Sequence, residues 1–191
     1  MHYHQYYPVD VINGPGTRAT LFVSGCEHQC PGCYNQSTWR LDGGKPFDEA
    51  MSDRIISDLN DSRIKRRGLS LSGGDPLHPA NVPQVLALVQ RVRAECPGKD
   101  IWCWTGYLLG ELSPAQRELV CLLDVLVDGK SSRGWPTPAC SGAAAATRSS
   151  TISTPGGSGS TKAGSPASCW PDDCASWVRR PPSAEPWLNP G

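Results

Sequence analysis

Short apolar segments recur along residues 19–129 and predict the strands of a sheet. They are ATLFVSG (19–25), GLSLSG (68–73), IWCWTG (101–106) and DVLVDG (124–129), and each ends in glycine. None alternates cleanly between apolar and polar residues, which is typical of strands buried on both faces of a parallel sheet. We therefore predict four parallel strands at these positions.

Helix-period patterns separate the predicted strands. Residues 47–59 place four apolar side chains on one face, and Asn81 is a predicted N-cap for a helix with a valine and leucine stripe. Ser113–Gln116 has the spacing of a capping box, with proline at the first helical position, for a helix through Leu123. This alternation predicts an α/β fold with right-handed crossovers, whose ligands bind beyond the carboxyl ends of the strands.

Composition changes after Lys130. Residues 131–191 contain 12 serines, 9 prolines and 7 glycines but only three branched aliphatic residues. Such a segment buries too little apolar surface to offset the entropy of ordering it. We predict one folded domain over residues 1–130, followed by a disordered or aberrant tail over residues 131–191.

Charge and cysteine content narrow the class of function. Lys and Arg total 18, as do Asp and Glu, so charge gives no case for nucleic acid or a membrane surface as a partner. The first residues lack the pattern of a signal peptide, and we expect a cytoplasmic location. Nine cysteines in a reducing compartment favour metal binding or redox chemistry over disulfides.

The loop SGCEHQCPGCYN after the first strand concentrates three cysteines. Cys26, Cys30 and Cys33 have the spacing Cys-x3-Cys-x2-Cys. Three thiolates can hold three irons of a [4Fe–4S] cluster and leave the fourth iron open to another ligand. Zinc bound with His28 is an alternative, disfavoured because His28 is only two residues from each flanking cysteine. Three cysteines packing as small apolar side chains are a further alternative, which the polar and turn-forming neighbours disfavour.

The turn LSGGDPL follows the second predicted strand. Gly73 and Gly74 permit close approach of a ligand to the backbone, and Asp75 follows them. Together with the cysteine loop, this turn resembles the radical S-adenosylmethionine (SAM) enzymes, whose Gly-Gly-Glu-Pro-like turn contacts the methionyl amino group of SAM. The resemblance implies a partial (β/α) barrel of radical SAM type with parallel strands.

Further segments resemble the glycyl-radical-enzyme activases that act on the anaerobic ribonucleoside-triphosphate reductase. They are VDVINGPGTR, FVSGC, CPGCYNQSTW, LNDSRIKRRGLSLSGGDPLHP, RAECPGKDIWCWTGY and VLVDGK, and they cover almost all of residues 1–130. The resemblance implies an enzyme that reductively cleaves SAM at a [4Fe–4S] cluster. The 5′-deoxyadenosyl radical then removes a hydrogen from a glycine of the reductase large subunit, with a flavodoxin-type protein as electron donor.

The same resemblance assigns residues by position. Cys26, Cys30 and Cys33 would ligate the cluster, and SAM would chelate the fourth iron. The residues implied to bind SAM are Gly32, Cys33 and Tyr34 on the adenosyl side, Gly73, Gly74 and Asp75 at the methionyl amino group, and Thr105, Asp128 and Lys130 at the strand ends. Related enzymes often have an aromatic residue where this chain has Gly32. No acid–base pair is implied.

The tail departs from the family after Lys130. Restoring one nucleotide there, with GC-rich codons, converts the following residues into KFVAGLADPGLLWRGSSNQVVHHL, which resembles the ending of the family. We therefore hypothesise that residues 131–191 are a frameshifted tail and not a native domain.

Two other functions remain open from the residues alone. One is a radical SAM enzyme that acts on a small molecule. The other is a non-catalytic metal-binding adaptor. A glycyl radical on the reductase would exclude both, and zinc without iron would favour the adaptor.

Overall fold

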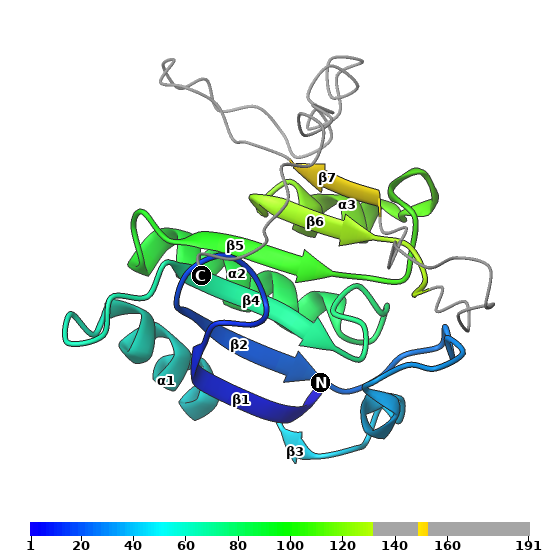
Figure 1. Cartoon of the computed structure of the whole chain (residues 1–191), viewed down its shortest axis with the longest axis horizontal. Coiled ribbons are helices and arrows are strands. Elements are labelled where there is room, and N and C mark those ends of the chain that lie inside the picture. The colour runs from blue at the N-terminus through cyan, green and yellow to red at the C-terminus, as the bar shows by residue number, and fades with distance from the viewer. Residues whose placement is uncertain (132–148, 153–191) are drawn as a thin grey trace, which may run out of the picture.

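The computed structural model describes residues 1–131 and 149–152, which form a mixed α/β fold around one sheet (Figure 1). Within these residues the sheet has seven strands in the order β3-β1-β2-β4-β5-β6-β7. The strands are β1 (His2–Asp10), β2 (Arg18–Val23), β3 (Lys45–Pro46), β4 (Gly68–Gly73), β5 (Asp100–Trp104), β6 (Val125–Asp128) and β7 (Ser149–Ile152). The helices are α1 (Glu49–Asn60), α2 (Val82–Glu95) and α3 (Pro114–Val120), with short 3-10 helices η1 (Gln36–Thr38) and η2 (Leu109–Glu111).

The four predicted strands form the parallel centre of the sheet. Strands β2, β4, β5 and β6 are parallel neighbours in chain order, so the prediction of a parallel α/β core is confirmed. Their carboxyl ends point toward one edge (Figure 1). The loops after these strands therefore meet at that edge, as the sequence predicted.

Antiparallel strands flank this parallel centre. Strand β1 pairs with β2, β3 pairs with β1, and β7 pairs with β6. The pairing of β1 with β2 is irregular between Tyr7 and Asp10, around Pro8, which has no backbone N–H to donate. The sequence patterns did not predict these flanking strands.

All three helices cover one face of the sheet (Figure 1). Leu21 of β2, Leu71 of β4 and Ile101 of β5 are fully buried on that face and belong to one hydrophobic core. Their partners from the helices include Ile55 of α1 and Val89 of α2. The apolar residues of each helix recur at the helical period, so they form one face that packs on the sheet. Burial of this face holds the strands whose ends contribute to the site.

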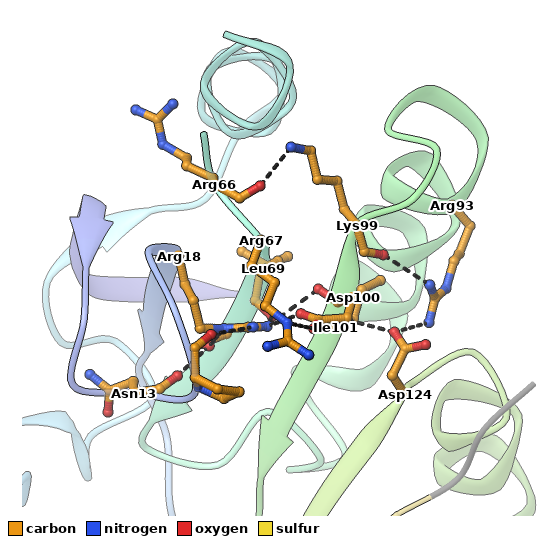
Figure 2. Close-up of polar contacts among 12 residues, drawn as sticks. Asn13, Arg18, Arg66, Arg67, Leu69, Arg93, Lys99, Asp100, Ile101 and Asp124 are labelled. Carbon is orange, nitrogen blue, oxygen red and sulfur yellow. Dashed lines mark hydrogen bonds and ion pairs between the residues drawn. The ribbon is translucent and has the colours of Figure 1, made fainter. Parts of the chain in front are cut away.

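A charged network holds the amino-terminal end of the parallel strands (Figure 2). Arg18 is fully buried, and its Nη2 lies 2.5 Å from Oδ1 of Asp100. The Nε of Arg18 donates to Oγ of Ser70 at 2.7 Å, and Nη2 donates to the Leu69 carbonyl at 3.0 Å. Ser70 in turn donates to the carbonyl of Asn13 at 2.5 Å, which fixes the loop between β1 and β2 against the sheet.

A second cation ties the helices to the same end. The Arg93 side chain on α2 donates to Oδ2 of Asp124 at 2.6 Å and to the Lys99 carbonyl at 3.2 Å (Figure 2). The backbone N–H of Ile101 donates to the same Asp124 oxygen at 2.6 Å. Each of these buried or half-buried cations therefore has several acceptors, as charges in a folded core require.

The predicted tail over residues 131–191 lies outside the described residues, apart from Ser131 and β7. Of the part of the chain that is described, no helix is long and apolar enough to cross a membrane.

Candidate functional site

The cysteine loop, residues 24–35, starts at the carboxyl end of β2 and lies beside the turn after β4. Gly25 and Cys26 donate backbone hydrogen bonds to the carbonyls of Thr38 and Trp39 at 2.7 and 3.0 Å. The backbone N–H of Asp75 donates to the Gly25 carbonyl at 2.7 Å. These bonds join the base of the cysteine loop to the Gly-Gly-Asp-Pro turn, so the structure brings together the two motifs that the sequence singled out.

The three cysteines lie in this one loop and form no disulfide within the described part of the chain. Each is partly exposed, and the N–H of Asn35 donates to Sγ of Cys33 at 3.3 Å. Gly32 takes a φ of 70° between Cys30 and Cys33, a left-handed conformation that glycine adopts without strain. Among the residues described, no three His, Cys, Asp or Glu side chains converge as a ready metal-ligand set.

The donor set nevertheless fits an iron–sulfur cluster by its chemistry. Three thiols within eight residues of a partly exposed loop match the thiolate ligands that such clusters use. Burial raises the pKa of the Cys26 thiol, with smaller contributions from the Asp75 charge. A metal would therefore displace a proton from this thiol on binding.

The Gly-Gly-Asp-Pro turn requires its glycines for close packing. Gly73 has a φ of 99°, in the left-handed region. A side chain at Gly74 would place Cβ 2.5 Å from the carbonyl oxygen of Gly25 and 2.9 Å from that of Thr38. Such contacts are too short for any Cβ, so the turn and the cysteine loop can approach this closely only with glycine at position 74.

Asp75 is the centre of a buried hydrogen-bond network at the carboxyl ends of the parallel strands, called here the Asp75 network. The residue is 1% exposed. Oδ1 accepts from the N–H of Leu77 and from Oγ1 of Thr105, both at 2.8 Å. Oδ2 accepts from the N–H of Gly106 at 2.9 Å and contacts Nε2 of His28 at 2.7 Å. One carboxylate therefore joins the cysteine loop, the turn after β4 and the turn after β5.

An exposed hydrogen bond also joins the cysteine loop to the turn after β5. The Tyr107 hydroxyl donates to Oε1 of Glu27 at 2.7 Å. This bond lowers the pKa of Glu27, and the charges of His78, His28 and Lys130 lower it further. Burial and the hydrogen bond to Glu27 raise the pKa of Tyr107. Glu27 is therefore ionised and Tyr107 protonated at neutral pH.

Of the other residues predicted to bind SAM, two are buried at the carboxyl ends of the strands and three are exposed. Thr105 is buried in the Asp75 network, and Asp128 is 4% exposed at the end of β6. Oδ2 of Asp128 accepts from the Leu109 N–H at 3.0 Å, while its buried Oδ1 has no hydrogen-bond partner among the described residues. Lys130 and Tyr34 are exposed, as is Gly32. Oγ of Ser24 and Oδ1 of Asn81 are also buried without a partner among the described residues, so a group bound at this end of the strands has several polar atoms to satisfy.

Two site residues were not found by sequence reasoning. Asn81 occupies the predicted N-cap position but makes no side-chain capping bond. Its Nδ2 donates instead to the carbonyls of Ser24 and Asp75, at 2.9 and 3.0 Å. Tyr107 was noticed only as part of the sequence TGY. Both act through residues distant in sequence, so local spacing holds no signal for them.

Comparison with known proteins first defines the class of this domain. Residues 12–143 match the family model described as a 4Fe-4S single cluster domain. The chain is therefore an iron–sulfur protein of that class, as the chemistry of its cysteine loop indicates.

Similar proteins then define the particular family. The chain is 73% identical over 130 residues to the anaerobic ribonucleoside-triphosphate reductase-activating protein of Escherichia coli strain K12, covering 68% of this chain and 84% of that protein. The protein of the same name from Vibrio cholerae is 69% identical over 130 residues, with the same coverage. The one from Enterobacteria phage T4 is 45% identical over 137 residues, covering 72% of this chain and 85% of the phage protein. The chain belongs to the family of anaerobic ribonucleoside-triphosphate reductase-activating proteins.

Proposed function

We propose that this chain activates an anaerobic ribonucleoside-triphosphate reductase by reductive cleavage of SAM at a [4Fe–4S] cluster, leaving a glycyl radical on the large subunit. The observation that supports this most is the Asp75 network, which holds the three-cysteine loop beside the Gly-Gly-Asp-Pro turn. The names of the similar proteins point to the same partner.

Cys26, Cys30 and Cys33 are the proposed cluster ligands. Three protein ligands leave one iron for the amino and carboxylate groups of SAM. When bound, a [4Fe–4S] cluster supplies a low-potential electron to the sulfonium of SAM. The chain itself supplies proximity, because the cysteine loop and the turn after β4 share backbone hydrogen bonds.

The proposed SAM site extends along the carboxyl edge. The backbone of Gly73 and Gly74 is partly exposed beside the cysteine loop, so it suits the methionyl end, with Asp75 holding the turn in place. Asp128 offers a cationic or hydroxyl group a buried oxygen that no described residue hydrogen-bonds. The proposed binding set is completed by Thr105, Lys130, Gly32, Cys33 and Tyr34.

We also propose that the sheet is part of a partial (β/α) barrel of radical SAM type. Parallel strands in chain order, with helices on one face, support this geometry. An incompletely closed barrel would admit a polypeptide loop of the reductase. A cytoplasmic location, with a flavodoxin-type reductant, suits thiols that must stay reduced.

Anaerobic reconstitution with iron and sulfide tests the proposal. We expect wild-type chain to take up a reducible cluster, form 5′-deoxyadenosine from SAM, and produce a glycyl radical signal when the reductase is added. Cys30→Ala should lose the cluster and the product, while Cys121→Ala, outside the loop, should keep both. SAM cleavage without a radical on the reductase would favour a small-molecule substrate, and bound zinc without iron would favour an adaptor.

A further inference from the structure

His28 lies between two proposed cluster ligands in the sequence, and its side chain is buried against Asp75. The imidazole is only 6% exposed, and its Nε2 lies 2.7 Å from Oδ2 of Asp75, a residue 47 positions away in sequence. The ring nitrogen nearest the protein interior is therefore already committed to a carboxylate.

The position under the His28 ring is a glycine. A Cβ on Gly106 would lie 2.2 Å from Cδ2 of His28 and 2.6 Å from its Nε2. The N–H of Gly106 also donates to the same Asp75 oxygen that His28 contacts. Since the backbone of Gly106 is outside the left-handed region, alanine would be excluded here by space and not by backbone strain.

An aromatic ring also contacts the histidine. The ring centroids of Tyr107 and His28 are 4.5 Å apart at an interplanar angle of 77°, an edge-to-face contact. The Tyr107 hydroxyl reaches Glu27, the neighbour of His28. The tip of the cysteine loop is thus held between Asp75, Gly106 and Tyr107, all from other loops.

We propose that His28 is a positioning residue and not a metal ligand. It seats the cysteine loop on the Asp75–Gly106 surface, and so fixes the distance between the cysteines and the Gly-Gly-Asp-Pro turn before any metal arrives. The seating itself stands on the geometry above. Its consequence for the cluster and for SAM rests on the proposed function.

Hydrogen–deuterium exchange of residues 26–35 in the metal-free full chain tests the seating directly. His28→Phe keeps a ring but removes the donor, and should speed exchange by about tenfold, the scale of one lost hydrogen bond to a charged acceptor. His28→Gln keeps a donor and should restore most of the protection. The exposed His4 serves as control, and His4→Gln should change nothing in this loop. Equal exchange in wild type and His28→Phe would overturn the proposal.

A double-mutant cycle tests the contact with Gly106. Gly106→Ala should speed exchange of the cysteine loop in the wild-type chain, because the new methyl group displaces the imidazole. In a His28→Ala background the same substitution should have no further effect, because the space is empty. Additive effects of the two substitutions would contradict the seating.

Electron paramagnetic resonance of the reconstituted chain tests whether His28 is a ligand of the cluster. With 15N-labelled histidine and no SAM, the reduced cluster should show no hyperfine coupling to a histidine nitrogen, and a strong coupling would overturn the proposal. His28→Phe should also need more SAM than wild type to change the spectrum of the reduced cluster. If SAM does not change the wild-type spectrum, the proposed function is wrong. The hydrogen–deuterium exchange rates still decide the role of His28.

Discussion

Replacing Asp75 with asparagine tests the centre of the site with a change of one atom. The two carboxylate oxygens of Asp75 together receive the N–H groups of Leu77 and Gly106, the Thr105 hydroxyl and the His28 ring. Asparagine has one oxygen and one NH2 group. Whichever position the NH2 group takes, it faces a backbone N–H that then lacks its acceptor, and the second contact at that position is lost or weakened.

The expected cost follows from these contacts. A hydrogen bond to a charged group contributes about 1.5–3 kcal/mol, so losing two would cost about 3–6 kcal/mol. Because asparagine also removes a charge that is costly to bury, we expect the lower end, about 3 kcal/mol. With a typical urea m-value of about 1–3 kcal/mol per molar, the unfolding midpoint should fall by about 1–3 M.

Urea unfolding of the metal-free chain, followed by tryptophan fluorescence, measures this cost. The ring centroids of Trp102 and Trp104 on β5 lie 5.8 Å apart, and these two of the seven tryptophans report on the sheet. Thr105→Val removes a single donor from the same carboxylate and should cost about 1.5–3 kcal/mol. Asp42→Asn, in an exposed ion pair with Arg40, should leave the midpoint unchanged. A loss below about 1 kcal/mol for Asp75→Asn would refute the network as the element that joins the three loops.

Other substitutions test the remaining parts of the fold. Asp100→Asn leaves the buried Arg18 without its carboxylate and should cost about 3–5 kcal/mol in urea unfolding, whereas adding Arg18→Met should recover part of that loss. Gly74→Ala should reduce iron uptake by the reconstituted chain, since the new Cβ meets the Gly25 carbonyl at 2.5 Å; unchanged iron content would contradict this. Ser113→Ala removes the capping box of α3 and should cost about 1 kcal/mol by the same unfolding assay.

The parallel centre of the fold was predictable because its signal is local. Continuous apolar runs such as VLV in β6 are typical of strands with both faces buried. The capping box at Ser113 is also local, and it is confirmed, although α3 ends at Val120 and not at Leu123. Strand β1 was missed because its side chains are half-buried or exposed, and its register depends on distant partners in β2 and β3.

The site shows the same division between local and distant information. Cysteine spacing and the glycine turn are local, and they predicted which loops meet at the carboxyl edge. Asn81 was predicted as a cap, but its amide is taken by the carbonyl of Ser24, 57 residues away. The contact of His28 with Asp75 spans 47 residues and leaves no pattern in the sequence. The sequence alone therefore left zinc binding by His28 as an alternative. The assignment of cluster and SAM residues stays a prediction.

The two ends of the parallel strands differ in how their polar groups are satisfied, and this separation has a practical use. Around Arg18 and Asp100, at the end remote from the cysteines, nearly all polar groups are paired with other groups of the chain. Labels, tethers or stabilising replacements placed near that end should leave the proposed cluster site at the opposite end undisturbed. An immobilised or spin-labelled form of the chain is best built there.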